Sequence, residues 1–350
     1  MDFTFSEDQL LFQESVRDFL VNEVTPERIR QSWETDSGRD DNLWQQLAEM
    51  GLSGLTVPEI HGGLGMSELD FVLLAQECGY VALPEPLVNT SLVAVPMLVE
   101  LGGELAEQWL PRIAGGEARV LVALEQNLVA EDAHVADLLL LEQGGAIYAL
   151  TPEQFSAEAN ESVDPSRRLF RVAINPGVAP VLAGDQAKPL IQAAMNRGAL
   201  ACAAQALGLA QRMIDISVTY TSERTQFGKP IGSFQAVKHH LADVAVRLEY
   251  AKAPVYRAAY ALANNVQGAV VAVSHAKLAA CEAASLGAKK GIQVHGAMGY
   301  TWEVDLHIFM KKAWALANTW GDAGFHKSRV AEAIFAEDAA IGADATFAGH

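Results

Sequence analysis

Two separate segments of this 350-residue chain combine anion-binding side chains with flat rings and glycines. The first, RTQFGKPIGSFQ, runs from Arg224 to Gln235, and the second, QVHGAMGY, begins at Gln293. Arginine presents a planar fork of N–H donors that suits a pyrophosphate. Phe227 offers a ring face, and the Gln235 amide can read the edge of a purine. Gly296 lets backbone N–H groups approach a ligand closely. Together the two segments predict a nucleotide-containing cofactor that lies across a bundle of helices.

Histidine and cysteine side chains can bind metals, but their spacing in this chain is not typical of a metal site. The three cysteines stand singly in apolar helical patterns, which is typical of small buried core residues. No pair of histidines has a spacing such as His-Glu-x-x-His, and His295 alone adjoins the glycine-containing segment. We therefore predict no metal site, and we interpret the remaining histidines as surface or interface residues: His239, His240, His307 and His326.

The elements that position these segments are mostly helices. Near the start of the chain, Ser6 precedes an apolar helical pattern and has Gln9 at the capping-box position. The second half of the chain is rich in Ala and Leu with interleaved charges, which is the composition of a helix bundle. There we predict helices at about 186–222, 234–264, 267–294, 304–317 and 321–337.

The middle of the chain has the sequence pattern of short β-strands separated by turns. Short apolar runs at 120–124, 138–141, 146–150 and 169–174 are separated by Gly, Pro, Asn and Asp. Four or five such runs make a small sheet. The fold class predicted for the chain is therefore mainly α with a small β-domain. Its predicted division is an N-terminal helical domain (1–118), a reduced β-domain (119–184) and a C-terminal helical bundle (185–350).

Composition and charge exclude several classes of function. The net charge of −18 would repel nucleic acids and anionic membranes, so neither is an expected partner. No window of about 18 apolar residues lacks charge or glycine, so we expect no transmembrane helix. The N-terminus has no basic flank followed by an apolar stretch, which argues against secretion. A cytoplasmic location is the resulting expectation.

Taken together, the motifs resemble those of the acyl-CoA dehydrogenases, flavoenzymes that desaturate acyl-CoA thioesters. The resemblance is carried by RTQFGKPIGSFQ, by the Gln-x-x-Gly-x-x-Gly segment and by the opening MDFTFSEDQLLFQESVRDFL. It implies an N-terminal helical domain, a middle β-domain and a C-terminal four-helix bundle. It also implies FAD as cofactor, with its adenosine side contacted from a neighbouring subunit by Arg224, Gln226, Phe227, Gln235, Gln293 and Gly296. Ala297 departs from the family's usual second glycine and narrows the backbone approach.

The family's catalytic carboxylate is missing from its usual places. Members of the family remove the substrate's α-proton with a Glu at one of two positions, which in this chain are Trp320 and Gly198. Neither residue can accept a proton. Asp322 is the nearest carboxylate, but we interpret it as an N-terminal charge on the last helix, where the helix dipole favours an anion.

A division of labour accounts for the missing base and the short β-domain. The chain resembles the smaller subunit of heterotetrameric acyl-CoA dehydrogenases that act on steroid side-chain CoA esters. This resemblance implies two copies of the chain with two of a larger homologue, an acyl-CoA substrate, and an electron-transfer flavoprotein or similar acceptor. Two alternatives stay open: a self-sufficient homomeric dehydrogenase, and a flavin-free scaffold or regulatory subunit. The identity of the acyl group is not fixed by the sequence.

Overall fold

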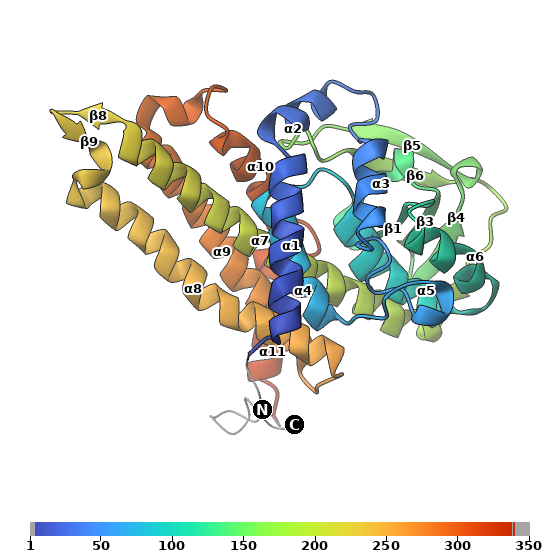
Figure 1. Cartoon of the computed structure of the whole chain (residues 1–350). Helices are drawn as coiled ribbons and strands as arrows, with labels where there is room; N and C mark the ends of the chain where they lie inside the picture. Colours follow the sequence, from blue (N-terminus) through green and yellow to red (C-terminus); the bar gives the residue numbers. More distant parts are fainter. Residues whose placement is uncertain (1–3, 338, 340–350) are drawn as a thin grey trace. The chain divides into compact units, whose positions relative to one another are not determined.

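The computed structural model describes residues 4–337 and 339, and helices make up most of them (Figure 1). The predicted helical bundle begins with one very long helix and continues through four more. The helices are α1 (Glu7–Glu23), α2 (Pro26–Trp33), α3 (Asp41–Glu49), α4 (Glu68–Tyr80), α5 (Val95–Leu101), α6 (Gly103–Ala114), α7 (Ala187–Glu223), α8 (Gln235–Ala263), α9 (Ala269–His295), α10 (Leu306–Ala317) and α11 (Ala323–Ile334).

Helix starts follow the capping signals in the sequence. The Ser6 hydroxyl accepts a hydrogen bond from the Gln9 backbone N–H at 3.2 Å, and the Gln9 amide oxygen accepts the Ser6 N–H at 2.9 Å. This reciprocal pair is the predicted capping box, and it starts α1. Asp40 caps α3 in the same manner, since its carboxylate accepts the N–H groups of Asn42 and Leu43.

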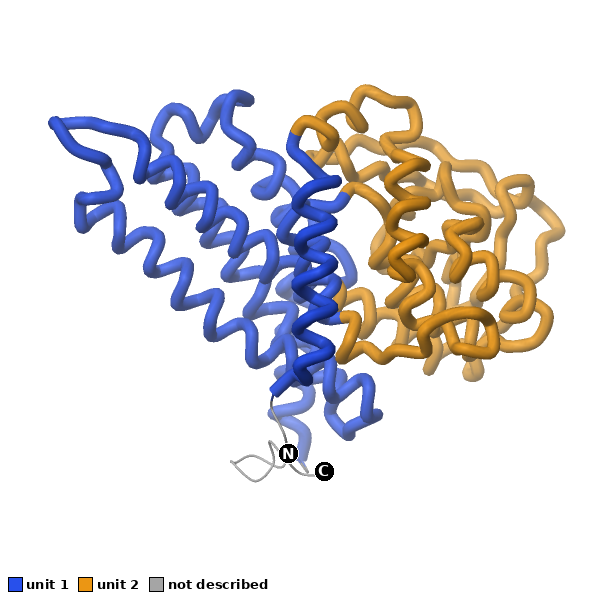
Figure 2. The backbone as a smooth tube through the Cα atoms, in the orientation of Figure 1, with its two compact units in different colours: residues 1–26, 72–83, 202–350 blue, residues 27–71, 84–201 orange. Residues whose placement is uncertain are grey.

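Two compact units are built from interleaved parts of the chain (Figure 2). The first comprises residues 1–26, 72–83 and 202–350, and the second comprises residues 27–71 and 84–201. Helix α7 therefore starts in the second unit and ends in the first. The division into domains of 1–118, 119–184 and 185–350 stays a prediction, and residues 338 and 340–350 lie outside the described residues.

The second unit contains two sheets. One has the strand order β1-β3-β4-β7, with β1 parallel to β3 and the other pairs antiparallel. The other is antiparallel, with the order β2-β6-β5. The strands are β1 (Val120–Ala123), β2 (Ala130–Glu131), β3 (Leu138–Gln143), β4 (Ala146–Leu150), β5 (Phe155–Asn160), β6 (Leu169–Ile174) and β7 (Leu182–Ala183). The four predicted strands are confirmed, but the prediction of one sheet from four or five strands is wrong.

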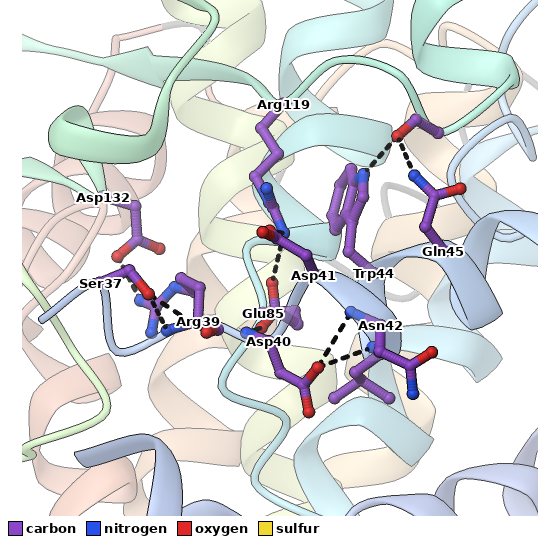
Figure 3. A network of polar contacts seen from close by, with 12 residues as sticks. Ser37, Arg39, Asp40, Asp41, Asn42, Trp44, Gln45, Glu85, Arg119 and Asp132 are labelled. Atoms are coloured by element: carbon purple, nitrogen blue, oxygen red, sulfur yellow. Dashed lines mark hydrogen bonds and ion pairs between the residues drawn. The ribbon is translucent and has the colours of Figure 1, made fainter. Parts of the chain in front are cut away.

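A network of charged side chains ties the segment that leads into α3 to the sheet region of the second unit (Figure 3). The Arg39 guanidinium pairs with Asp132, and both side chains are almost fully buried. Glu85 accepts the Asp40 backbone N–H at 2.8 Å and lies 3.5 Å from the Arg119 guanidinium. Burial raises the pKa of the Glu85 carboxyl to about 6. These pairs act together with the buried side chains of Leu43, Trp44 and Leu47 to hold α3 in place.

The first unit is a helix bundle in which small residues let α9 pack closely against its neighbours. Its buried face includes Ala276, Ala280, Ala283 and Ala284, and a Cβ added at Gly291 would meet the Leu306 side chain of α10 at 3.1 Å. By length and composition, α9 with the turn after it (Ala269–Tyr300) passes the test for a membrane-spanning helix, and 44% of its most apolar window is buried within the protein. Core helices of globular proteins meet the same criterion.

Two glycines allow the backbones of α4 and α7 to touch within the first unit. A Cβ added at Gly208 would lie 1.9 Å from the Gln76 carbonyl oxygen, and one added at Gly79 would lie 2.0 Å from the Gln205 carbonyl oxygen. No side chain fits at either place. The crossing of these helices is therefore fixed by two reciprocal backbone contacts.

Candidate functional site

The arginine-containing segment folds as a tight hairpin at the end of α7. The Arg224 N–H donates to the Tyr220 carbonyl at 2.9 Å, which closes the last helical turn. Strand β8 (Thr225–Gln226) then pairs with β9 (Lys229–Pro230). The two-residue loop between them, Phe227-Gly228, has positive φ at both positions, 55° and 76°. Two positive φ values in succession define the hairpin turn that matches the natural twist of the strands.

The hairpin presents the side chains predicted to bind the cofactor to solvent. Phe227 is 90% exposed, and Arg224 and Gln226 are also exposed. Across residues 4–337 and 339, the Arg224 guanidinium makes no ion pair and no hydrogen bond. Phe234 supports the loop from below, because its ring meets that of Phe227 edge-on at 6.2 Å and the Lys229 ammonium lies 4.4 Å from its centre. The hairpin thus carries an exposed cation and an exposed ring, three residues apart in the chain.

The remaining predicted contacts lie where α8 begins and α9 ends. Gln235 is the first residue of α8, and Gln293 lies in the last turn of α9; both side chains are exposed. Gly296 follows with φ 60°, and no atom lies within 4 Å of the Cβ that it lacks. The short helix of Gly296–Tyr300 then turns away from α9, and Ala297 within it is exposed. Open backbone next to exposed amides can receive a polar ligand.

Tyr220 and His295 bring the two segments together. Their rings stack with centroids 4.3 Å apart and planes inclined by 24°. The Tyr220 hydroxyl also donates to the His295 carbonyl at 3.4 Å. Tyr220 lies one helical turn before Arg224, and His295 directly precedes Gly296. The segments predicted to hold one nucleotide therefore lie side by side at one end of the bundle (Figure 1).

A pocket of about 470 Å³ opens beside the hairpin. Its walls come from the last turns of α7, from β9 and the turn after it, and from the first turns of α8. The lining is mostly apolar, and Lys238 is the charged residue in it. The other lining residues include Val218, Thr221, Pro230, Val237 and Leu241. A volume of this size lies within the range of small-molecule sites.

The positions of the family's base carry no proton acceptor in the structure. Gly198 is buried in the first third of α7. Trp320 is 6% exposed and has φ 56°, a left-handed conformation that is uncommon for a bulky residue. Asp322 caps α11, since its carboxylate accepts the Phe325 N–H at 2.8 Å. Its position at the N-terminus of the last helix agrees with the interpretation of Asp322 as a capping charge.

Buried basic groups hold the turn that contains Trp320. The Lys277 ammonium, 2% exposed, donates to the carbonyls of Leu316 and Thr319, the latter at 2.9 Å. His326 is fully buried and His307 nearly so, so the interpretation of these two histidines as surface or interface residues is wrong. The Nε2 of His326 lies 2.9 Å from the Trp320 carbonyl. Burial lowers the pKa of His326 to about 4. The imidazole is therefore neutral at pH 7, with Nε2–H as the donor to Trp320.

Two supporting residues were not identified from the sequence. Tyr220 lies inside a regular helical pattern, where its spacing from Arg224 is the one available signal. Lys277 reads as a solvated lysine in an Ala-rich helix. No group of three or more His, Cys, Asp or Glu side chains that could hold a metal lies within the part of the chain that the structure describes.

Two family descriptions match the chain. "Acyl-CoA dehydrogenase, N-terminal domain" matches residues 6–117, and "Acyl-CoA dehydrogenase, C-terminal domain" matches residues 189–335. Acyl-CoA dehydrogenase IpdE2 of Mycobacterium tuberculosis is 33% identical over 310 residues, which cover 88% of this chain and 91% of that protein. This chain belongs to the acyl-CoA dehydrogenase family. Its members are oxidoreductases, so the predicted family and enzyme class are confirmed.

Further comparisons agree with this assignment. IpdE2 of Mycolicibacterium smegmatis is 32% identical over 321 residues, covering 90% of this chain and 95% of that protein. A variant of the Tcur3481-Tcur3483 steroid ACAD has 25% identity and a TM-score of 0.84, covering 93% of this chain and 97% of that one. The ChsE4-ChsE5 complex from Mycobacterium tuberculosis has 24% identity and a TM-score of 0.85, covering 97% and 100%. The predicted acyl-CoA dehydrogenase fold is confirmed.

Proposed function

We propose that this chain is a subunit of an FAD-dependent acyl-CoA dehydrogenase and supplies the adenosine-diphosphate side of an FAD site shared with a neighbouring subunit. The observation that carries the proposal is the exposed Arg224 guanidinium on the same hairpin as the exposed Phe227 ring, with the Tyr220–His295 stack joining the base of this hairpin to the segment that ends at Gly296. An exposed arginine with no carboxylate partner among the described residues, on one hairpin with an exposed ring and joined to a segment of open backbone, fits a ligand that carries phosphates and a purine.

Each residue has a distinct part in this arrangement. Arg224 would donate two parallel hydrogen bonds to the pyrophosphate, and Phe227 would cover a flat face of the nucleotide. Gln226, Gln235 and Gln293 would donate to or accept from sugar and base atoms. The open backbone at Gly296 would admit the ligand to van der Waals contact. When bound, FAD would supply the acceptor for the hydride that leaves the acyl Cβ.

The catalytic base would come from a larger homologous subunit, because Trp320 and Gly198 occupy the family's base positions in this chain. Two copies of each subunit would form the assembly. Its reaction would convert an acyl-CoA into the 2-enoyl-CoA, with an electron-transfer flavoprotein or similar protein as electron acceptor. The similarity to the Tcur3481-Tcur3483 steroid ACAD supports a bulky, steroid-type acyl group as the substrate of this chain's complex. A cytoplasmic location stays a prediction.

Substitution of Arg224 tests the cofactor contact. Arg224→Ala removes a charged hydrogen-bond donor whose loss costs about 1.5–3 kcal/mol, or about tenfold to a hundredfold in FAD affinity. FAD retention is measured in the complex with the larger homologue by flavin fluorescence after gel filtration. Arg247→Ala is the matched control, because Arg247 is an exposed arginine on α8, away from the hairpin. Equal FAD retention in the Arg224 variant and the wild type would refute the assignment.

Purification with and without the partner tests the division of labour. The visible spectrum is recorded for the chain alone and for the chain co-expressed with a larger homologue. Flavin absorbance that is present only in the co-expressed complex supports the shared site. Absorbance in the chain alone supports the homomeric enzyme, and its absence from both samples supports a flavin-free scaffold.

A further inference from the structure

Beneath the exposed contacts lies a stacked pair of rings, buried His295 and half-buried Tyr220, to which the proposed function assigns no contact with FAD. His295 is 3% exposed, whereas Gln293 and Gly296 on either side of it are exposed. On the other side of the stack, the Tyr220 carbonyl accepts the N–H of Arg224 at 2.9 Å. The pair therefore connects the base of the hairpin to the base of the glycine turn.

The orientation of the His295 ring is fixed from within α9. Its Nδ1 lies 2.8 Å from the Gly291 carbonyl, an acceptor, so Nδ1 carries the proton and donates. Burial lowers the pKa of His295, which keeps the imidazole neutral at pH 7. Its Nε2 is buried and has no hydrogen-bond partner among the described residues. One hydrogen bond and one stacked face thus define the position of the ring.

This arrangement has a cost that simple packing would avoid. A buried acceptor without a donor is destabilising, and an apolar ring such as phenylalanine would offer a similar face to Tyr220 without that acceptor. The turn after α9 packs closely on the last turn of that helix, because a Cβ added at Gly299 would lie 3.2 Å from the His295 Cβ and 3.0 Å from the Ile292 backbone. The ring is therefore carried by the helical turn against which the glycine turn packs.

We propose that Tyr220 and His295 are positioning residues that hold the Arg224 hairpin and the Gln293–Gly296 segment at the spacing that the adenosine-diphosphate part of FAD requires. The inference rests on the proposed function. The two segments approach the ligand from different helices, and each must be in place before binding. A stacked pair that fixes both segments before binding reduces the conformational entropy that would otherwise be lost when the ligand binds.

Four variants test the stacked face, all studied in the complex with the larger homologue. His295→Ala and Tyr220→Ala remove one ring each, and we expect about tenfold weaker FAD binding, since two side chains must then be ordered on binding. His295→Phe and Tyr220→Phe keep the faces, and we expect them to stay within about threefold of wild type. Tyr250→Ala is the control, because Tyr250 is 77% exposed on α8. Binding is measured by fluorescence titration with FAD and, separately, with ADP as a fragment probe.

A double-mutant cycle separates positioning from general stabilisation. If His295 positions Arg224, Arg224→Ala weakens FAD binding at least about tenfold in the wild type but less than about threefold in the His295→Ala background. A merely structural role would lower the melting temperature of His295→Ala while the factor for Arg224→Ala stayed the same. That result overturns the proposal. So does equal weakening by His295→Phe and His295→Ala, which would assign the effect to a ring nitrogen and not to the stacked face.

The failure of this inference can be told from the failure of the proposed function. If Arg224→Ala itself leaves FAD binding unchanged, the cofactor contact is wrong, and the positioning role falls with it. If Arg224→Ala weakens binding while both alanine variants of the ring pair bind FAD and ADP as the wild type does, the cofactor contact stands and the positioning role alone is refuted.

Discussion

Acidification should destabilise the bundle through His326, which is fully buried behind the Trp320 turn. Burial is the main cause of its low pKa, and the nearby cations Lys277 and Arg329 lower the pKa further, whereas the bond to the Trp320 carbonyl and the Asp322 carboxylate raise it. The folded-state pKa is about 4, below the value of 6.5 for a free imidazole. Between these values the unfolded chain binds a proton that the folded chain does not. Stability is therefore fully present above about pH 6.5 and falls as the pH drops toward 4.

The size of the effect follows from the two pKa values. At pH 5 the unfolded state gains about 2 kcal/mol from protonation that the folded state lacks, and at pH 7 it gains about 0.2 kcal/mol. The expected difference between the two pH values is thus about 1.8 kcal/mol. His326→Gln should remove this difference, whatever it does to stability at pH 7. His239→Gln, at an exposed histidine on α8, serves as the control.

Urea unfolding of the wild type and both variants at pH 5 and pH 7 measures these differences. The wild type and His239→Gln should lose the same free energy of unfolding on acidification, and His326→Gln should lose about 1.8 kcal/mol less. An equal pH dependence in His326→Gln and wild type would show that His326 is protonated in the folded state or solvated. Either outcome would refute the buried, neutral imidazole.

Three further predictions concern other parts of the chain. Asp322→Asn should keep the α11 cap and leave turnover of the complex within a few-fold of wild type, because the proposed base lies on the larger subunit. A positioned base contributes at least about a hundredfold to the rate. A loss of that size with normal FAD content would place the base on this chain. Gly208→Ala should lower the free energy of unfolding by about 1–3 kcal/mol or prevent folding, because its methyl group would meet the Gln76 carbonyl. Urea titration measures this, with Gly115→Ala as the control, because Gly115 is exposed, has φ −79° and leaves room for a methyl group. Burial raises the pKa of Glu85 to about 6, so its contribution to the free energy of unfolding is greatest at low pH and falls as the pH rises from 4.5 to about 6. Glu85→Gln should remove about 2 kcal/mol of pH dependence between these two pH values. Thermal or urea unfolding across this pH range measures the change.

Long, regular elements could be predicted from the sequence, and short or polar ones could not. Helix α8 was predicted at 234–264 and spans Gln235–Ala263, because its apolar period and its flanking breaks agree. Strand β5 (Phe155–Asn160) was missed because its sequence, FSAEAN, has no apolar run and is mostly exposed. Its hydrogen bonds to β6 hold it in the sheet, and that partnership lies outside any local window of sequence.

In the candidate site too, contiguous motifs could be predicted from the sequence, whereas contacts between distant residues could not. Arg224 and Phe227 belong to one contiguous motif, and the structure places them on one hairpin. The stack of Tyr220 on His295 joins residues 75 positions apart, so no local pattern predicts it. The buried position of Lys277 was also beyond the sequence, since lysine is seldom buried and its partners here are backbone carbonyls, which carry no sequence signal.

The hairpin turn has a consequence for attempts to stabilise this protein. Its first loop position favours Asn or Gly, and a bulky residue with φ 55° costs about 1–2 kcal/mol relative to a relaxed backbone. A redesign guided by folding stability alone would replace Phe227 with Asn and would score the change as an improvement. The same change would delete the exposed ring. At position 227, selection for higher folding stability and selection for ligand binding therefore work in opposite directions.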